Sequence, residues 1–212
     1  MMQYPANSVQ PIVEYMINGG GGGNSLGDTA QLVDEYRSYC MRHFETISPW
    51  LLPKATTITD IGPGVGGIDV LICNSRDIGV LHIVEGDGDG KRRHGFHPYT
   101  KAWADRSIAL DFIKANVKCS VFGHDPDPDL TLGSNLIISL KSWGHHYPIS
   151  TYLGFAQRSL RLGGRIIMDI RNHRGGLAEM QAGGFRCIGK ADYDSPKCER
   201  LIFERARTHV RA

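Results

Sequence analysis

The stretch Thr57-Ile-Thr-Asp-Ile-Gly-Pro-Gly-Val-Gly-Gly67 constrains the fold more than any other part of the sequence. Residues 56–61 form a short apolar, β-branched run that predicts a buried strand, and residues 68–73 continue as a helix. A glycine-rich turn joins them. Strand, glycine turn and helix in this order hold nucleotide-like ligands in α/β sheets, because glycines let the backbone approach the ligand and the helix N-terminus presents free N–H groups.

Two sequence patterns fit this turn. Gly62, Gly64 and Gly67 satisfy G-x-G-x-x-G, the dinucleotide-binding fingerprint. Asp60, Gly62, Gly64 and Gly66 satisfy acid-x-G-x-G-x-G, which resembles the first motif of class I S-adenosylmethionine-dependent methyltransferases. A tight strand-to-helix turn without a ligand is the third interpretation. The rest of the sequence is needed to choose among these three interpretations.

Composition narrows the class of protein. A chain of 212 residues with 41% hydrophobic and 22% charged residues favours one ordinary globular domain. The net charge of +2 does not indicate a strong nucleic-acid or membrane field. The 5 cysteines are odd in number and lack C-x-x-C spacing, which argues against a disulfide framework or a structural zinc site and favours a reducing compartment. No apolar run approaches the roughly 20 residues of a membrane span, and no signal-peptide pattern opens the sequence, so we expect a cytoplasmic protein.

The N-terminal segment, residues 1–49, is expected to differ from the core domain, residues 50–212. Residues 1–27 look irregular, and the glycine run at residues 19–23 predicts a flexible stretch that is either a lid over the ligand or a loose tail. Asp28 or Thr29 is a candidate cap for a packing helix that runs to about Thr46.

Strands and helices then alternate. Further strands are expected at residues 79–85, 117–122, 135–140 and 165–170, with helices at 102–116 and 148–162, the latter closed by Gly163-Gly164. A helix at 173–182 and two strands at 185–190 and 201–204 complete the chain. This order predicts a single Rossmann-like, doubly wound α/β sheet that is mostly parallel and ends in an antiparallel strand.

This layout is similar to the class I methyltransferase fold over about residues 50–205. Asp60 to Gly66 stands where that family wraps the methionine part of its cofactor, and Glu85, at the end of the second strand, stands where an acid takes both ribose hydroxyls. Asp125 stands where a residue often faces the adenine amine. The stretch 160–167 resembles the family's L-x-P-G-G turn, with Leu162 in place of proline.

The resemblance implies binding of S-adenosyl-L-methionine and release of S-adenosyl-L-homocysteine. The residues implied in cofactor binding are Asp60, Gly62, Pro63, Gly64, Gly66, Glu85, Gly86, Asp125, Leu140 and Lys141. A dehydrogenase is disfavoured, although Glu85 suits a dinucleotide ribose, because little chain remains for a substrate domain. The Tyr193-x-x-x-Lys197 pair contains Pro196 and lies in a predicted turn, so it cannot form the helical reductase signature.

Residues 141–148 follow the fourth strand, at the sheet edge where α/β proteins bind ligands. His145 or His146 could serve as general base for a hydroxyl acceptor, and Trp143 and Tyr147 could wall the acceptor. The alternative is that both histidines are polar loop residues and Trp143 is core. The stretch lacks the Asn/Asp-Pro-Pro-aromatic pattern of amino-methyltransferases. With the helix at Tyr152 it is similar to small bacterial methyltransferases assigned to sugar O-methylation.

We therefore expect methyl transfer to a small-molecule acceptor, by O-methylation of a hydroxyl group, without a metal. His94, His97, His124 and Asp125 could be metal ligands, but their spacing fits no specific site. Two alternatives stay open. One is a methyltransferase acting on RNA or protein, which only the basic residues Lys91-Arg92-Arg93 and Lys101 support. The other is a non-catalytic cofactor-binding protein. Because the fold has no cap domain, a homodimer partner is one way to close the acceptor pocket.

Overall fold

The computed structural model describes residues 6–17, 27–86, 96, 105–127 and 129–205 of the chain. Its N-terminal part contains α1 (Ala6–Ile17), α2 (Thr29–Ile47) and the 3-10 helix η1 (Ser48–Trp50). The first half of the sheet region contains β1 (Thr57–Ile61), α3 (Gly67–Ser75), β2 (Val80–Val84), α4 (Arg106–Lys114), β3 (Ser120–His124) and β4 (Ser134–Ser139). The second half contains η2 (Ile149–Thr151), α5 (Leu153–Ser159), β5 (Leu160–Arg171), α6 (Gly176–Ala182), β6 (Phe185–Lys190) and β7 (Cys198–Arg205).

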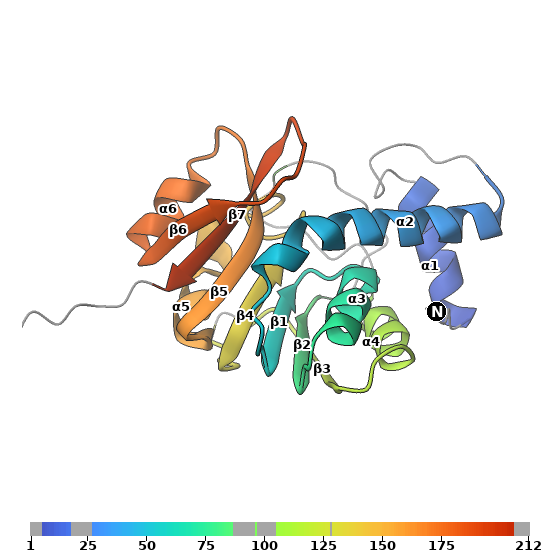
Figure 1. Cartoon of the computed structure of the whole chain (residues 1–212). Coiled ribbons are helices and arrows are strands. Elements are labelled where there is room, and N and C mark those ends of the chain that lie inside the picture. Colours follow the sequence, from blue (N-terminus) through green and yellow to red (C-terminus); the bar gives the residue numbers. More distant parts are fainter. Residues whose placement is uncertain (1–5, 18–26, 87–95, 97–104, 128, 206–212) are drawn as a thin grey trace, which may run out of the picture.

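One seven-stranded sheet in the order β3-β2-β1-β4-β5-β7-β6 organises the molecule (Figure 1). Neighbouring strands from β3 to β5 are parallel, whereas β7 is antiparallel to both β5 and β6. The predicted mostly parallel sheet with an antiparallel C-terminal strand pair is therefore confirmed. Strand β1 pairs with β2 on one side and β4 on the other, so the strand order reverses beside β1, where open α/β sheets bind ligands.

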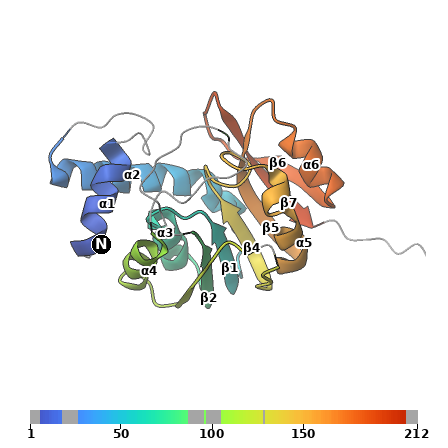
Figure 2. The same ribbon diagram turned by 180° about the vertical axis from the view of Figure 1, so that it is seen from behind.

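The two faces of the sheet bury separate apolar cores, because successive side chains of a strand point to opposite faces. Strand β4 shows this alternation. Leu136 and Ile138 pack with α1 to α4, whereas Ile137, which lies between them, packs with α5 and α6. Figures 1 and 2 show α3 and α4 beside the β1–β3 half of the sheet and α5 and α6 beside the other half, while the C-terminal end of α2 reaches β7 through Thr46 and Arg200. Among the described residues, no helix has the length and apolar character needed to cross a membrane.

Helix α2 begins where the sequence predicts. The Asp28 carboxylate accepts a hydrogen bond from the Gln31 backbone N–H at 2.9 Å, and the Gln31 side-chain oxygen accepts one from the Asp28 N–H at 3.0 Å. This capping box satisfies two N–H groups at the helix start. The buried face of α2 includes Leu32, Tyr36 and Cys40, so the helix packs against the sheet domain rather than extending away from it.

Several elements differ from expectation, among them α1, α5 and β3. Residues 6–17, expected to be irregular, form α1, which includes Pro11. The helix expected over 148–162 ends at Ser159, and Gly163-Gly164 lie inside β5, where Leu160 pairs with Ser134 before a register shift. Strand β3 begins at Ser120 rather than at residue 117. The glycine run at residues 19–23 lies outside the described residues.

A buried ion pair joins β5 to β7, and its arginine also contacts the C-terminal end of α2. The guanidinium of Arg200 on β7 donates to the Asp169 carboxylate on β5 at 2.8 and 2.9 Å, and both side chains are fully buried. Arg200 also donates to Thr46 at 2.6 Å and lies 2.9 Å from Nδ1 of His43. Burial, with Arg200 nearby, lowers the pKa of His43 to about 2, so this imidazole is neutral and accepts the bond.

Candidate active site

The turn that follows β1 contains three glycines whose backbone angles are unfavourable for residues with side chains. Gly62, Gly64 and Gly66 have φ angles of 77°, 62° and 89°, in the left-handed region. A Cβ on Gly62 would lie 2.0 Å from the Oγ atom of Ser142, so the turn also touches the segment after β4. The Gly62 N–H donates to the Val84 carbonyl at 3.0 Å, which joins the turn to the end of β2. The chain ends of β1, β2 and β4 therefore meet at the glycine turn.

Helix α2 also contacts this turn. The Gly67 N–H, at the start of α3, donates to the Tyr36 hydroxyl at 3.0 Å. A Cβ on Gly67 would lie 2.5 Å from the Cys40 sulfur, so only glycine fits here. The sequence places Tyr36 and Cys40 on one helical face but gives no signal that this face covers the glycine turn.

Glu85 lies directly beyond β2 and against the same turn. Its carboxylate accepts a hydrogen bond from the Gly64 N–H at 3.4 Å, and the side chain is buried. Burial raises the pKa of Glu85 to about 8, although hydrogen bonds from the Gly64 and Gly86 backbone act in the opposite direction. A carboxylate with free acceptor capacity beside a glycine turn is suited to bind the two hydroxyls of a ribose.

Asp60 faces a second buried carboxyl that sequence reasoning did not single out, that of Asp69 on α3. Burial, followed by the nearby charges of Asp69 and Glu85, raises the pKa of Asp60 well above its usual value. Local sequence signals could not identify this pair, because the contact depends on how α3 folds back along β1.

The segment after β4 is fixed by hydrogen bonds of Ser139. Its hydroxyl donates to the Ile61 carbonyl at 2.8 Å and accepts from the Trp143 N–H at 2.8 Å. The Lys141 backbone has a φ of 56°, and its N–H donates to the Asp169 carboxylate at 3.1 Å. Its ammonium lies 5.3 Å from the centre of the Tyr39 ring, and burial lowers its pKa.

Trp143 is fully buried, and its indole N–H donates to the Ile149 carbonyl at 2.9 Å. These contacts are those of a core residue, the alternative considered for Trp143 in the sequence, and we do not propose it as an acceptor wall. Tyr147 is half-buried, and its carbonyl accepts from the Gly144 N–H at 3.0 Å.

The two histidines differ in environment. His145 is buried, and its Nδ1 has no hydrogen-bond partner in the described part of the chain. Burial, with the charge of His146, lowers the pKa of His145 to about 3. His146 is half-buried, and its ring meets that of His145 edge-on at 4.7 Å. Because a base with a pKa near 3 is weak at neutral pH, the environment favours His146 over His145 as a proton acceptor.

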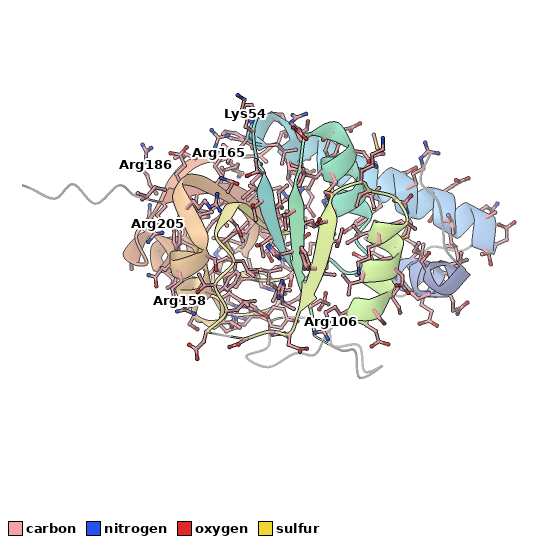
Figure 3. All side chains as sticks on the ribbon, turned by 90° about the horizontal axis from the view of Figure 1, so that it is seen from below. Lys54, Arg106, Arg158, Arg165, Arg186 and Arg205 are labelled. Atoms are coloured by element: carbon pink, nitrogen blue, oxygen red, sulfur yellow. The ribbon has the colours of Figure 1, made fainter. Side chains whose placement is uncertain are left out.

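Three of the other residues expected to bind the cofactor, Pro63, Gly86 and Leu140, are half-buried near the ends of β1, β2 and β4. The side chain of Asp125 is exposed and forms an ion pair with Arg106, whose guanidinium also donates to the Glu85 carbonyl at 3.4 Å. Figure 3 shows Arg106 at the start of α4, whereas Arg165, Arg186 and Arg205 lie at the β5–β7 side of the molecule.

A metal site gains no support from the described residues, which contain no group of three or more His, Cys, Asp or Glu side chains placed to hold an ion. The Nε2 atom of His124 lies 3.0 Å from Nδ1 of His82 on the neighbouring strand. His94, His97, Lys91-Arg92-Arg93 and residues 98–103, with Lys101, lie outside the described residues.

No protein-family model matches the chain, and no curated protein matches it. Solved structures do match. The chain is similar to a putative methyltransferase from Haloferax volcanii solved in complex with a methyltransferase activator, with a TM-score of 0.59 and 11% identity over 92% of this chain and 98% of that one.

The names of two further similar structures mention S-adenosylmethionine (SAM). One is a TehB-like SAM-dependent methyltransferase from Corynebacterium glutamicum, with a TM-score of 0.56 and 13% identity over 93% of this chain and 97% of that one. The other is magnesium protoporphyrin IX methyltransferase from Synechocystis with bound SAM, with a TM-score of 0.54 and 12% identity over 96% and 100% of the two chains. The chain therefore has the class I methyltransferase fold.

Proposed function

We propose that the protein is an S-adenosylmethionine-dependent methyltransferase that acts on a small hydroxylated acceptor. The observation that carries the proposal is the buried Glu85 carboxylate, held by the Gly64 N–H against a turn of three left-handed glycines. The site lies beside β1, where the strand order reverses. The similar solved structures, two of them named as SAM-dependent or SAM-bound methyltransferases, support the same cofactor.

The residues at the turn fit this cofactor. Glu85 would accept hydrogen bonds from the ribose hydroxyls, and the backbone of Gly62 to Gly66 would lie against the methionine part. The orphaned Oδ1 of Asp60 is an acceptor for a cationic group. Pro63, Gly86, Asp125, Leu140 and Lys141 would line the remaining contacts, with Asp125 held by Arg106. When bound, S-adenosylmethionine would supply the methyl group of its sulfonium to an acceptor oxygen in line with the breaking S–CH3 bond, with S-adenosylhomocysteine as the leaving group.

The chain's own contribution to the reaction is positioning and proton removal. We assign the acceptor side to residues 141–148, which touch the glycine turn through Ser142. His146 would accept the proton of the acceptor hydroxyl, and Tyr147 would lie along the acceptor. His145, with its depressed pKa, would stay neutral. A sugar as the acceptor is supported by the sequence likeness of this segment to small sugar O-methyltransferases.

Isothermal titration with S-adenosylmethionine, S-adenosylhomocysteine and NAD tests the cofactor. We expect both adenosyl compounds to bind and NAD to give no signal. Glu85→Ala should weaken adenosyl binding at least about tenfold, because two hydrogen bonds to a carboxylate are lost. Glu179→Ala, an exposed acid on α6, is the matched control and should leave affinity unchanged. Binding of NAD alone would overturn the proposal and favour a dehydrogenase.

Turnover on a panel of hydroxylated acceptors, sugars included, tests the base. His146→Ala should lower kcat about 100-fold or more with little change in cofactor affinity. His145→Ala should lower it less. Equal kcat values for wild type and His146→Ala would remove His146 from the mechanism, and binding without turnover on any acceptor would favour a non-catalytic protein.

A further inference from the structure

Two carboxyl side chains meet beneath the glycine turn. Asp60 is on β1 and Asp69 is in the first turn of α3, and their side chains are 5% and 1% exposed. Asp69 lies close enough to Asp60 for its charge, together with burial, to raise the pKa of Asp60. Oδ2 of Asp69 lies 3.7 Å from the position of a Cβ on Gly66, so the pair underlies the turn itself.

This pair lacks other side-chain partners. Oδ1 of Asp60 and both carboxyl oxygens of Asp69 are buried, and none has a donor among the other side chains in the described part of the chain. Two buried carboxyls in contact cannot both ionise readily, because their charges repel and water is excluded. The ligand-free pair therefore holds one shared proton.

The titratable groups that face the pair come from four directions. Glu85 faces it from the end of β2, Cys40 from α2, Cys119 from the segment before β3, and Cys73 from α3. All four are acids, so none of them supplies a positive charge to the pair. Among the described residues these four groups leave the pair without a countercharge, and a cationic ligand in the turn would supply one.

We propose that Asp69 is a second acidic residue of the cofactor site, which shares one proton with Asp60 and releases it to solvent when the cationic methionine end of the cofactor binds. This inference rests on the proposed function. An ammonium close to the pair favours its fully ionised form, so binding and proton release are linked. Asp69 is thus a positioning residue, acting on the ligand through Asp60.

Proton release measured by titration calorimetry tests the inference. Ligand-binding heats are compared in phosphate and Tris, whose ionisation enthalpies differ, at about pH 7, the region to which burial raises the pKa of Asp69. The two ligands are S-adenosylmethionine and 5′-methylthioadenosine, which shares the adenosine part but lacks the ammonium. We expect S-adenosylmethionine to release close to one more proton per site. Both ligands contain the ribose assigned to Glu85, so any proton that Glu85 releases is the same for both and cancels in the difference between them.

The double variant Asp60→Asn/Asp69→Asn keeps the shape of both side chains but cannot hold the shared proton. It should bind both ligands with equal proton release. Asp60→Asn/Asp69→Ser, in which the second side chain is smaller and also neutral, should behave in the same way, so that the result does not depend on one particular substitution. Equal release for the two ligands in the wild type overturns the inference, as does a difference that persists in both variants.

A ligand-free readout separates the two proposals. The infrared band of protonated carboxyl groups, recorded at about pH 7 in a Glu85→Gln background, should be present with Asp60 and Asp69 and lost with Asp60→Asn/Asp69→Asn. Its absence with Asp69 overturns the shared proton even where the cofactor binds. If instead the band is present and neither ligand binds, the proposed function fails, and the linkage to the cofactor fails with it.

Discussion

The carboxylate of Glu85 accepts a hydrogen bond from the backbone N–H of Gly64, 21 residues earlier in the chain. Through this contact the end of β2 supports the glycine turn that follows β1. The same contact leaves a buried acid whose pKa is raised to about 8 by burial. Because the ionised form of Glu85 is disfavoured in the fold, the ligand-free protein has a stability that depends on pH.

We expect the stability of the ligand-free protein to fall as pH rises. The pKa of Glu85 is raised from 4.5 to about 8, so between these values the folded state binds a proton that the unfolded chain has released. Each pH unit in this window costs up to about 1.4 kcal/mol. Urea unfolding at about pH 6 and about pH 8.5 measures the slope, which Glu85→Gln should reduce. Asp60 and Asp69 act with the same sign, so the slope should not vanish. Identical slopes for the two proteins would contradict this prediction.

Alanine at Gly62 should be much more harmful than alanine at Gly163. Both glycines have a φ of 77°, so both variants carry the left-handed strain of about 1–2 kcal/mol. Only at Gly62 would the new Cβ meet another residue, 2.0 Å from Oγ of Ser142, whereas nothing lies within 4 Å at Gly163. Thermal unfolding and S-adenosylmethionine titration of both variants measure the difference. Ser142→Gly should recover part of the loss in Gly62→Ala, and no recovery would show that the clash is not its cause.

Removing one partner of the buried ion pair should destabilise the protein strongly. Asp169→Asn leaves the Arg200 guanidinium buried without its countercharge, and we expect a loss of about 3–5 kcal/mol in the free energy of unfolding. The control is Glu199→Gln, which breaks the exposed pair with Lys190 and should cost less than about 1 kcal/mol. Denaturant unfolding of both variants decides, and equal losses would show that burial does not set the difference.

Much of the fold follows from local signals. The alternation of apolar runs with helical patterns is sufficient for the parallel strands and the final antiparallel pair. Helix α1 is not evident, because Pro11 and the nearby glycine run favour irregular structure in a local pattern. Likewise, Gly163-Gly164 resemble a helix stop, yet they continue β5 because Leu160 pairs with Ser134 across the sheet. Pairing between distant residues cannot be inferred from the segment itself.

The candidate site likewise contains residues that the sequence identifies and residues that only the fold reveals. Glu85 is identifiable because it directly ends a strand at a fixed distance from the glycines. Tyr36 and Asp69 are not, because their roles depend on how helices α2 and α3 pack against the turn. His145 and His146 are adjacent in sequence, and only the folded backbone distinguishes the buried ring from the half-buried one.

The thiol of Cys119 should react with alkylating agents faster than the other four. A hydrogen bond from Cys73 lowers the pKa of Cys119 to about 7, whereas the same bond and burial raise that of Cys73. Because the thiolate is the nucleophile, Cys119 should react with iodoacetamide at neutral pH ahead of the buried Cys40. Peptide mass spectrometry over time measures the rates. Cys73→Ala should slow the reaction because it removes the donor, and an unchanged rate would contradict the assigned cause.

The position of Arg200 on the last strand has a consequence for protein synthesis. The carboxylate of Asp169 receives its countercharge from a residue that leaves the ribosome 31 positions later. Until then, β5 carries an uncompensated acid toward the interior, and a nascent chain that stops short of β7 cannot complete the sheet without burying it. Products that terminate before β7 should therefore remain sensitive to proteases, whereas chains that include β7 should resist them even without a ligand.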